Sequence, residues 1–211
     1  MCGRFALWSD KNKILEHYQL DEIPEHYSGY NIYPTKNILV ARQTDKRELV
    51  NMYWGYLPHG FYKESYETPN AWNHKILGKS KFYFESFNKR RCLIPVDGYY
   101  EWREKPEPKQ PFFIRVHDSG LFSLAGLWDT WETPQGPREG CCLIMTPPAE
   151  KLAHIHHSTP VIIKTEDYDE WLQAGGERFI QNPSAMDYDF WPVSTRTNSP
   201  RNQGPELIQP L

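Results

Sequence analysis

Cys2 has the most distinctive chemistry in this sequence, because it follows Met1 directly and precedes Gly3. Removal of Met1 would leave Cys2 with a free α-amine and a thiol on one residue. An α-amine titrates near pH ~7.7 and a thiol near ~8.5, so both have reactive fractions near neutral pH. Such a 1,2-aminothiol condenses with an aldehyde to an imine, which the thiol then closes into a thiazolidine ring. Position alone leaves open the alternative that Cys2 is an inert or buried residue.

Glu101 and Asn70 are two further polar residues that stand out in the sequence. Glu101 stands between Tyr100 and Trp102, and apolar surroundings raise the pKa of a carboxyl group toward neutrality, where it can exchange protons. The alternative is a strand glutamate that faces solvent. Asn70 follows Pro69 in an expected loop, where an asparagine taken alone is most often a turn residue.

A histidine-rich segment contains His154, His156 and His157. His156 stands out because it lies between His154 and His157. The spacing of His154 and His156 on a strand would also suit a metal ion, but no third Cys, Asp or Glu ligand stands nearby. The sequence therefore predicts neither a metal ion nor a cofactor. A purely structural histidine is the alternative for each position.

Basic and aromatic residues alternate in one central segment of the chain. Basic groups contact phosphates, and aromatic rings stack on the bases of single-stranded nucleic acid. The alternative is an amphipathic helix whose aromatic side lies in the core. The basic members of this set, with one from the N-terminus, are Arg4, Lys79, Lys81, Lys89, Arg90 and Arg91, and the aromatic members are Phe82, Tyr83, Phe84 and Phe87.

Composition limits the classes of function. The net charge of −3 means that any site for a polyanion must be a local patch. The four cysteines form no CxxC pair, and two of them are adjacent, so we expect a reduced, cytoplasmic protein. No apolar run approaches the ~20 residues that span a bilayer, and no secretory signal is visible. We expect a monomer that does not contact membranes.

Short strands and a few short helices predict an α+β fold with a curved, mostly antiparallel, barrel-like sheet. The 211 residues indicate one domain, 1–211, with an extended C-terminal tail from about 198. Residues 59–76 read as a loop. Strands are expected at 38–43, 48–54, 92–95, 98–102, 112–116, 121–131, 141–145 and 161–163, and helices at 9–18, 79–91, 148–154 and 167–172.

The order of several motifs resembles the SOS-response-associated peptidase (SRAP) family, the abasic-site shield proteins. The motifs are Met1-Cys2-Gly3-Arg4, Asn31-Ile32-Tyr33-Pro34-Thr35, Trp54-Gly55, Leu57-Pro58, Asn70-Ala71, Arg91-Cys92-Leu93-Ile94-Pro95, Asp97-Gly98-Tyr99-Tyr100-Glu101-Trp102, Ala125-Gly126-Leu127-Trp128, Met145-Thr146, and His156 four residues before Pro160. The resemblance runs from Cys2 to about Asn198.

The resemblance implies that the protein binds single-stranded DNA at an abasic site and attaches to it through a thiazolidine. Cys2 would be the nucleophile after self-removal of Met1, and Asn70 would orient its amine or the product ring. Glu101 would move protons during Met1 removal, imine formation and reversal. His156 would act as acid or base in opening the sugar. A weak lyase activity is an expected side reaction, and Arg4, Trp72, Lys89, Arg90 and Arg91 are the candidate DNA contacts.

Two departures from the family pattern concern DNA contacts. Trp72 stands where the family commonly has Arg, with His74 in place of a following Glu, and Ser158 stands at a second Arg position. Each lost Arg removes a salt-dependent phosphate contact. Trp72 could instead stack on a base.

Two other functions fit the same sequence. Cys2 could serve as the N-terminal nucleophile of a cysteine hydrolase that acts on peptides or amides, with His156 or the terminal amine as base. The chain could also be a non-catalytic module that binds nucleic acid or protein. Unchanged binding after Cys2→Ala, with Met1 retained, would favour the module.

Overall fold

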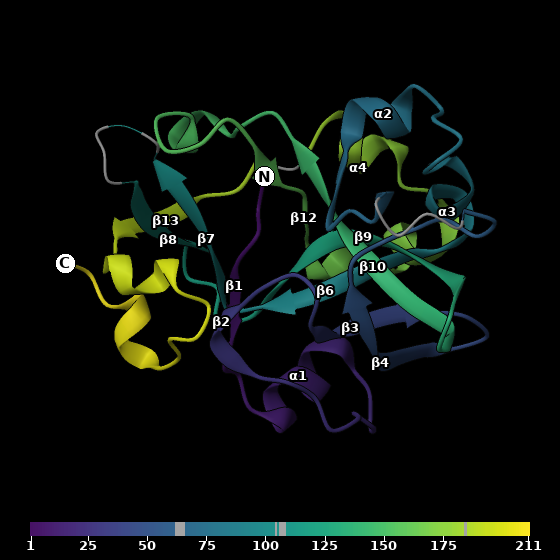
Figure 1. Cartoon of the computed structure of the whole chain (residues 1–211), viewed down its shortest axis with the longest axis horizontal. Coiled ribbons are helices and arrows are strands. Elements are labelled where there is room, and N and C mark those ends of the chain that lie inside the picture. The colour runs from purple at the N-terminus through teal and green to yellow at the C-terminus, as the bar shows by residue number, and fades with distance from the viewer. Residues whose placement is uncertain (62–65, 104, 106–108, 184) are drawn as a thin grey trace.

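Two β-sheets and several short helical segments form the fold (Figure 1). The computed structural model describes residues 1–61, 66–103, 105, 109–183 and 185–211. The predicted α+β class with a curved, mostly antiparallel sheet is confirmed. No helix in these ranges is both long and apolar enough to cross a membrane.

The larger sheet closes into a barrel. Strand β10 pairs with β4 in parallel and with β9 in antiparallel orientation, and the remaining neighbours β4–β3, β3–β6 and β6–β9 are all antiparallel. Apolar side chains of these strands fill the core, and consecutive residues such as 38–41 and 141–145 are buried, so both faces of the strands are covered there. The barrel strands are β3 (Asn37–Gln43), β4 (Arg47–Trp54), β6 (Arg91–Val96), β9 (Phe122–Thr133) and β10 (Gly136–Thr146).

Three short strands extend the barrel sheet along β9 and β10. Strand β5 pairs with β10 in parallel, β11 pairs with β10 and β12 pairs with β9. Their bounds are β5 (Asn70–Trp72), β11 (Thr159–Pro160) and β12 (Ile162–Ile163). Strand β5 falls in the segment 59–76 that we expected to be a loop, so that expectation was wrong for residues 70–72.

The smaller sheet is antiparallel and has the strand order β13-β8-β7-β1-β2. In Figure 1, β1 lies between the barrel and the strands β7 and β8. The sequence patterns missed β1, β2 and β13. The bounds are β1 (Phe5–Leu7), β2 (Gly29–Ile32), β7 (Gly98–Arg103), β8 (Gln110–Val116) and β13 (Tyr188–Pro192).

Asp97 joins the two sheets and fixes β1 against β7. It is the single residue between β6 and β7, and its buried carboxylate accepts hydrogen bonds from the main-chain N–H groups of Trp8 (2.6 Å) and Ser9 (2.7 Å). The next residue, Gly98, allows close packing, because a Cβ there would lie 2.1 Å from the Phe113 ring. This junction holds the N-terminal strand in place.

The helices are short. Helix α1 (Lys11–Tyr18) begins after Asp10, whose side chain accepts from the Lys13 N–H, and it buries Ile14 and Tyr18. This confirms the helix expected at 9–18. The other α-helices are α2 (Asn73–Leu77), α3 (Phe84–Lys89) and α4 (Glu177–Gln181).

Several expected helices are shorter or of another type. The helix expected at 79–91 is only Phe84–Lys89, because residue 91 already belongs to β6. The segment 148–154 holds only a 3₁₀ turn, Glu150–Leu152, after two prolines. The helix expected at 167–172 is divided between a 3₁₀ turn, Thr165–Asp167, and a π turn, Glu170–Ala174.

The C-terminal tail is packed, which corrects the extended tail expected from about residue 198. It forms a 3₁₀ turn, Pro205–Ile208, in which Leu207 is fully buried. The Gln203 amide donates to the Asn31 carbonyl (3.0 Å), and the Asn31 side chain donates to main-chain carbonyls of the tail. The tail therefore supports the strand β2 next to β1.

We expect Leu207→Ala to lower the free energy of unfolding by about 2–4 kcal/mol, since it leaves a cavity under the tail. Leu211→Ala is the matched control, because Leu211 is 76% exposed and its truncation should change stability by less than about 0.5 kcal/mol. Urea unfolding of both variants measures the difference. Equal stabilities would show that the tail does not pack as described.

Candidate functional site

Strand β1 carries Cys2 onto the end of β7. Phe5 pairs with Tyr99, and the Tyr100 N–H donates to the Arg4 carbonyl at 2.9 Å. Continuing this antiparallel register brings Cys2 alongside the segment that contains Glu101. The N-terminus and β7 are therefore joined by main-chain pairing, although they are far apart in sequence.

The Cys2 thiol is completely buried. Its Sγ–H donates to the Arg4 carbonyl at 3.6 Å. Burial raises the pKa of this thiol well above its usual range, and the neighbouring Glu101 carboxylate raises it further. Cys2 is therefore held as a neutral thiol while Met1 is attached.

Glu101 is buried beside Cys2, with 2% of its surface exposed. Burial raises the pKa of its carboxyl to about 8, although the positive α-amine of Met1 opposes this shift. Its Oε2 lies 3.5 Å from the His156 Nε2. Its Oε1 is buried and has no hydrogen-bond partner among the described residues. A carboxyl group with this pKa can give or take a proton near neutral pH.

His156 lies between the N-terminus and Glu101. Its Nε2 is 2.5 Å from the Met1 nitrogen, and its Nδ1 is 3.4 Å from the Trp102 carbonyl oxygen. The main-chain N–H of His156 donates to the carbonyl of Leu152 in the preceding 3₁₀ turn, and this bond fixes the main chain at His156. Three of the residues singled out in the sequence, Cys2, Glu101 and His156, thus lie around the terminal amine.

Asn70 lies on β5, which pairs with β10. Strand β11, which follows His156 in the chain, also pairs with β10. The Thr68 hydroxyl donates to the Asn70 carbonyl at 2.7 Å and accepts from its N–H. The Asn70 side chain is 5% exposed, and its Oδ1 has no hydrogen-bond partner in the described ranges. This oxygen is available to accept a hydrogen bond from a bound group.

Tyr99 is a further residue of this site that we did not single out from the sequence. It shares a face of β7 with Glu101, as alternation along the strand predicts. Its hydroxyl is buried and has no partner within the described part of the chain. Burial raises the pKa of this hydroxyl far above its usual value, and the charges of Tyr188, Cys2 and Glu101 add to the shift. Tyr99 is therefore a neutral hydrogen-bond donor facing the site.

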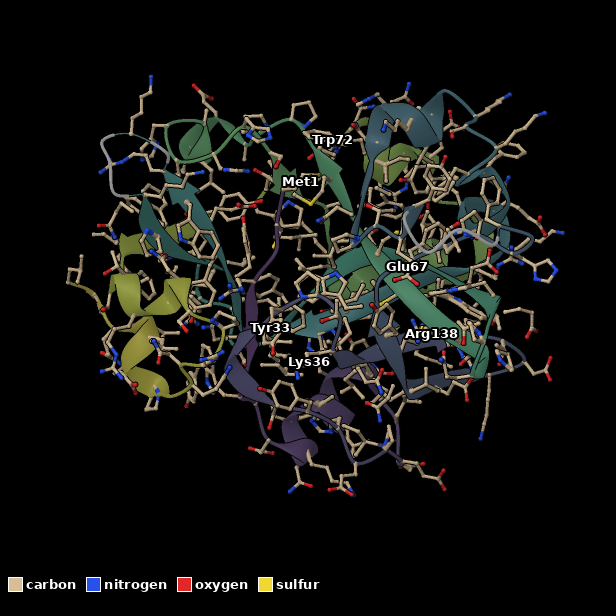
Figure 2. All side chains as sticks on the ribbon, viewed as in Figure 1. Met1, Tyr33, Lys36, Glu67, Trp72 and Arg138 are labelled. Atoms are coloured by element: carbon tan, nitrogen blue, oxygen red, sulfur yellow. The ribbon has the colours of Figure 1, made fainter. Side chains whose placement is uncertain are left out.

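Trp72 lies at the edge of the site. Its ring stacks on His157, with centroids 6.1 Å apart and planes 23° apart, and the His157 ring lies 4.2 Å from that of His156. Figure 2 shows Met1 and Trp72 close together. Trp72 and Asn70 are two residues apart on β5 and so share a face of this strand.

Arg4 is anchored by its guanidinium group. It donates to the Asn31 Oδ1 at 2.7 Å and to the Thr197 carbonyl at 2.9 Å. The group remains partly exposed and lies over the rings of Tyr33 and Trp102, 5.8 Å from each centroid. A fixed cation therefore stands two residues from Cys2.

The basic run 89–91 is elsewhere, at the end of α3, which Figure 1 shows at the opposite side of the barrel from β7. Arg91 is buried and donates to the Trp171 and Phe87 carbonyls. Arg90 pairs with Asp129 at 3.1 Å, and Lys89 is an exposed partner of Glu85. Because the Arg91 side chain is buried, it cannot contact a phosphate, and the expectation that Arg91 contacts DNA was wrong.

Two other features of the described residues bear on binding. No group of three or more His, Cys, Asp or Glu side chains within them is arranged to hold a metal ion. A cavity of about 670 Å³ is lined by residues 19–24 and 46–49, and it contains none of the site residues.

Comparisons with known proteins agree in one family. The model of the SOS response associated peptidase (SRAP) family matches residues 1–200. The chain is 35% identical to the abasic site processing protein YoqW of Bacillus subtilis, with 99% of each chain covered. It is 33% identical to the abasic site processing protein YoaM of the same organism, with 99% of this chain and 97% of YoaM covered. A crystal structure of a Bacteroides thetaiotaomicron protein superposes with a TM-score of 0.79 over all of both chains, at 23% identity.

Proposed function

The chain belongs to the SOS response associated peptidase family, and from this premise we propose that it processes abasic sites by capturing them covalently in single-stranded DNA. The observation that carries the proposal is the set of groups around the terminal amine. The His156 Nε2 lies 2.5 Å from the Met1 nitrogen and 3.5 Å from Glu101, beside the buried Cys2 thiol.

The first step is removal of Met1 by the protein itself. A water molecule adds to the Met1 carbonyl, the bond from this carbon to the Cys2 nitrogen breaks, and the nitrogen takes up a proton. Glu101 and His156 stand where they can take the proton from water and return it to nitrogen. Met1 is 53% exposed, so the released residue can leave. The products are free methionine and a chain with Cys2 at its terminus.

The second step is imine formation. The C1–O4 bond of the abasic sugar breaks as His156 protonates the ring oxygen, and the C1 hydroxyl loses its proton to water, which gives the aldehyde. The Cys2 amine attacks the aldehyde carbon first, and the thiol acts in the next step. One water molecule leaves with the help of the Glu101 carboxyl, which has a pKa of about 8 and can supply the proton.

The third step closes the ring. The Cys2 sulfur bonds to the imine carbon, and the thiol proton passes through Glu101 to the imine nitrogen. The Asn70 Oδ1, which lacks a partner in the described structure, accepts a hydrogen bond from the ring N–H. The whole sequence from aldehyde to thiazolidine releases one water. An imine that does not close can undergo β-elimination, which gives the weak lyase activity.

The DNA is held by a local patch near the site. Arg4 supplies a fixed positive charge, and Trp72 offers a ring next to His157. This suits binding of a single strand with exposed bases. All the groups of the proposed mechanism come from one chain, so we propose that a monomer is sufficient.

Incubation of the purified protein with an oligonucleotide that carries one abasic site tests the proposal. We expect a protein–DNA adduct that survives boiling and denaturing electrophoresis, and an intact mass that lacks Met1. The same strand with an intact base should give no adduct. A folded protein without Met1 that forms no adduct would contradict the proposed function.

A peptide or amide hydrolase is the second candidate, because His156 lies at the terminal amine and could activate Cys2 as an N-terminal nucleophile. Its distinguishing result is turnover of a peptide supplied in trans. If Cys2-dependent turnover occurs without any DNA adduct, this second function replaces the first.

A further inference from the structure

A row of alternating cationic and aromatic side chains leads away from His156. The Trp102 carbonyl contacts the His156 ring, and the Arg4 guanidinium lies 5.8 Å from the Trp102 ring centroid. The Arg4 guanidinium also lies 5.8 Å from the centroid of the Tyr33 ring. The Lys36 ammonium lies 5.2 Å from the centroid of the same ring. Tyr33 is thus held by two cations.

The segment that carries Tyr33 and Lys36 has a fixed and strained main chain. Thr35 has a φ of 74°, which is unfavourable for a β-branched residue. Two hydrogen bonds to buried Trp54 impose it, from the Thr35 N–H to the Trp54 carbonyl (2.9 Å) and from the Trp54 N–H to the Lys36 carbonyl (2.8 Å). Strain of this kind persists where surrounding structure enforces it, and it is concentrated at functional sites.

The charges of this row are available to a ligand. Within the described ranges, neither Arg4 nor Lys36 has a carboxylate within 4.0 Å, whereas Arg90 pairs with Asp129 and Lys89 with Glu85. Lys36 is exposed and Tyr33 is half-buried. An unneutralised cation beside a partly exposed ring fits a nucleotide, whose phosphate and base need these two groups.

In the view of Figure 2, Met1 is drawn between Trp72 and the pair formed by Tyr33 and Lys36. A strand that places its abasic sugar at Cys2 has one flank on each side of that sugar. Trp72 and the Tyr33 pair therefore suit different flanks.

We propose that Tyr33 and Lys36 form a nucleotide subsite, in which Tyr33 stacks on a base in one flank of the abasic strand and Lys36 contacts its phosphate. This rests on the proposed function for the choice of DNA. The subsite supplies a phosphate contact of a kind that Trp72 and Ser158 cannot make. It gives this chain a binding surface that depends on stacking and on few charges.

The test is equilibrium binding to a single-stranded oligonucleotide with a tetrahydrofuran spacer, which mimics an abasic sugar but has no aldehyde. We expect Tyr33→Ala to weaken binding about 10-fold, and Tyr33→Phe to retain it. Lys36→Ala should reduce the slope of log K against log salt by about 0.7. Fluorescence anisotropy across a salt series measures both effects. Tyr66→Ala and Lys46→Ala are controls, because both side chains are exposed and belong to other segments.

Position is tested with two further oligonucleotides, one with the spacer at its 5′ end and one with the spacer at its 3′ end. The Tyr33→Ala effect should persist with one and vanish with the other. The proposal is overturned if Tyr33→Ala binds as tightly as Tyr66→Ala. It is also overturned if Tyr33→Ala weakens binding equally with both oligonucleotides. Failure of the proposed function is a separate result, since wild-type protein would then bind these strands but form no adduct with a true abasic site.

Discussion

Cys2→Ser should reduce the heat-stable DNA adduct to background, a loss of about 100-fold or more. Serine retains the terminal α-amine, so an imine can still form. Its hydroxyl is a far weaker nucleophile than a thiol, and the imine returns to aldehyde and amine by hydrolysis. The measurement is the yield of boiling-resistant adduct with an abasic strand after a fixed time. An imine trapped with borohydride in the variant would show that the amine step survives.

Cys92→Ala is the matched control for this variant. Cys92 is also a free and fully buried cysteine, but it lies in the barrel strand β6. Its loss should leave adduct formation unchanged while the protein remains folded. Wild-type yields from Cys2→Ser, or an equal loss in Cys92→Ala, would contradict the assignment of Cys2 as nucleophile.

In a Glu101→Gln chain that is already free of Met1, adduct formation should be slower by about 10²–10⁴-fold, the range that general acid–base catalysis supplies. Glutamine fills nearly the same volume but cannot exchange a proton. In the wild type the rate should change through a pKa of about 8, the value that burial gives to Glu101. The variant should lose this inflection. Rates measured between pH 6 and 9 give the comparison, and a wild-type pH profile in Glu101→Gln would remove Glu101 from the mechanism.

The same pKa predicts how stability depends on pH. The carboxyl has a pKa of about 8 in the folded chain and 4.5 as its ordinary value, so the folded state binds this proton more tightly. Its contribution to stability is complete below pH ~4.5 and is lost as the pH rises toward ~8, by up to about 1.4 kcal/mol for each pH unit.

Glu101→Gln removes this dependence. We therefore expect the variant to gain stability relative to wild type as the pH rises from 5 to 8. Urea unfolding at several pH values measures the difference. A constant difference across this range would mean that the pKa of Glu101 is not raised in the folded protein.

The pattern of neighbouring residues was sufficient to predict several barrel strands and the face of β7 that carries Glu101. Alternation along residues 98–102 predicted that Glu101 and Tyr99 share a face, and they do so on β7. The hairpin around residues 44–47 follows from two β-rich runs and a polar turn, and it forms β3 and β4. These features depend on neighbours in the sequence.

Long-range pairing could not be predicted in the same way. The register of Phe5 with Tyr99 joins residues more than ninety positions apart. It is established by the main-chain bond from Tyr100 to Arg4 and by the bonds of Asp97 to residues 8 and 9. That Cys2 and Glu101 lie together follows from this register, whereas His156 reaches them from a separate segment through its contacts with the Met1 nitrogen and the Trp102 carbonyl. Their catalytic roles stay a prediction.

The basic run 89–91 was predicted to contact DNA, but its sequence did not show that two of its charges are bonded within the fold. A cluster of cations in the sequence does not reveal which donors are already used. Arg91 is buried and bonded to main-chain carbonyls, and Arg90 is neutralised by Asp129. By contrast, Tyr33 and Lys36 gave little signal, because their relation to Arg4 depends on the turn at Thr35 and its bonds to Trp54.

The most direct test of the account is mass analysis of the N-terminal peptide after reaction with an abasic strand and no reducing agent. We expect the strand on Cys2, with Met1 absent and a mass equal to the sum of the two reactants minus one water. An adduct on a lysine, an adduct seen only after borohydride reduction, or a Cys2 peptide that still carries Met1 would contradict it.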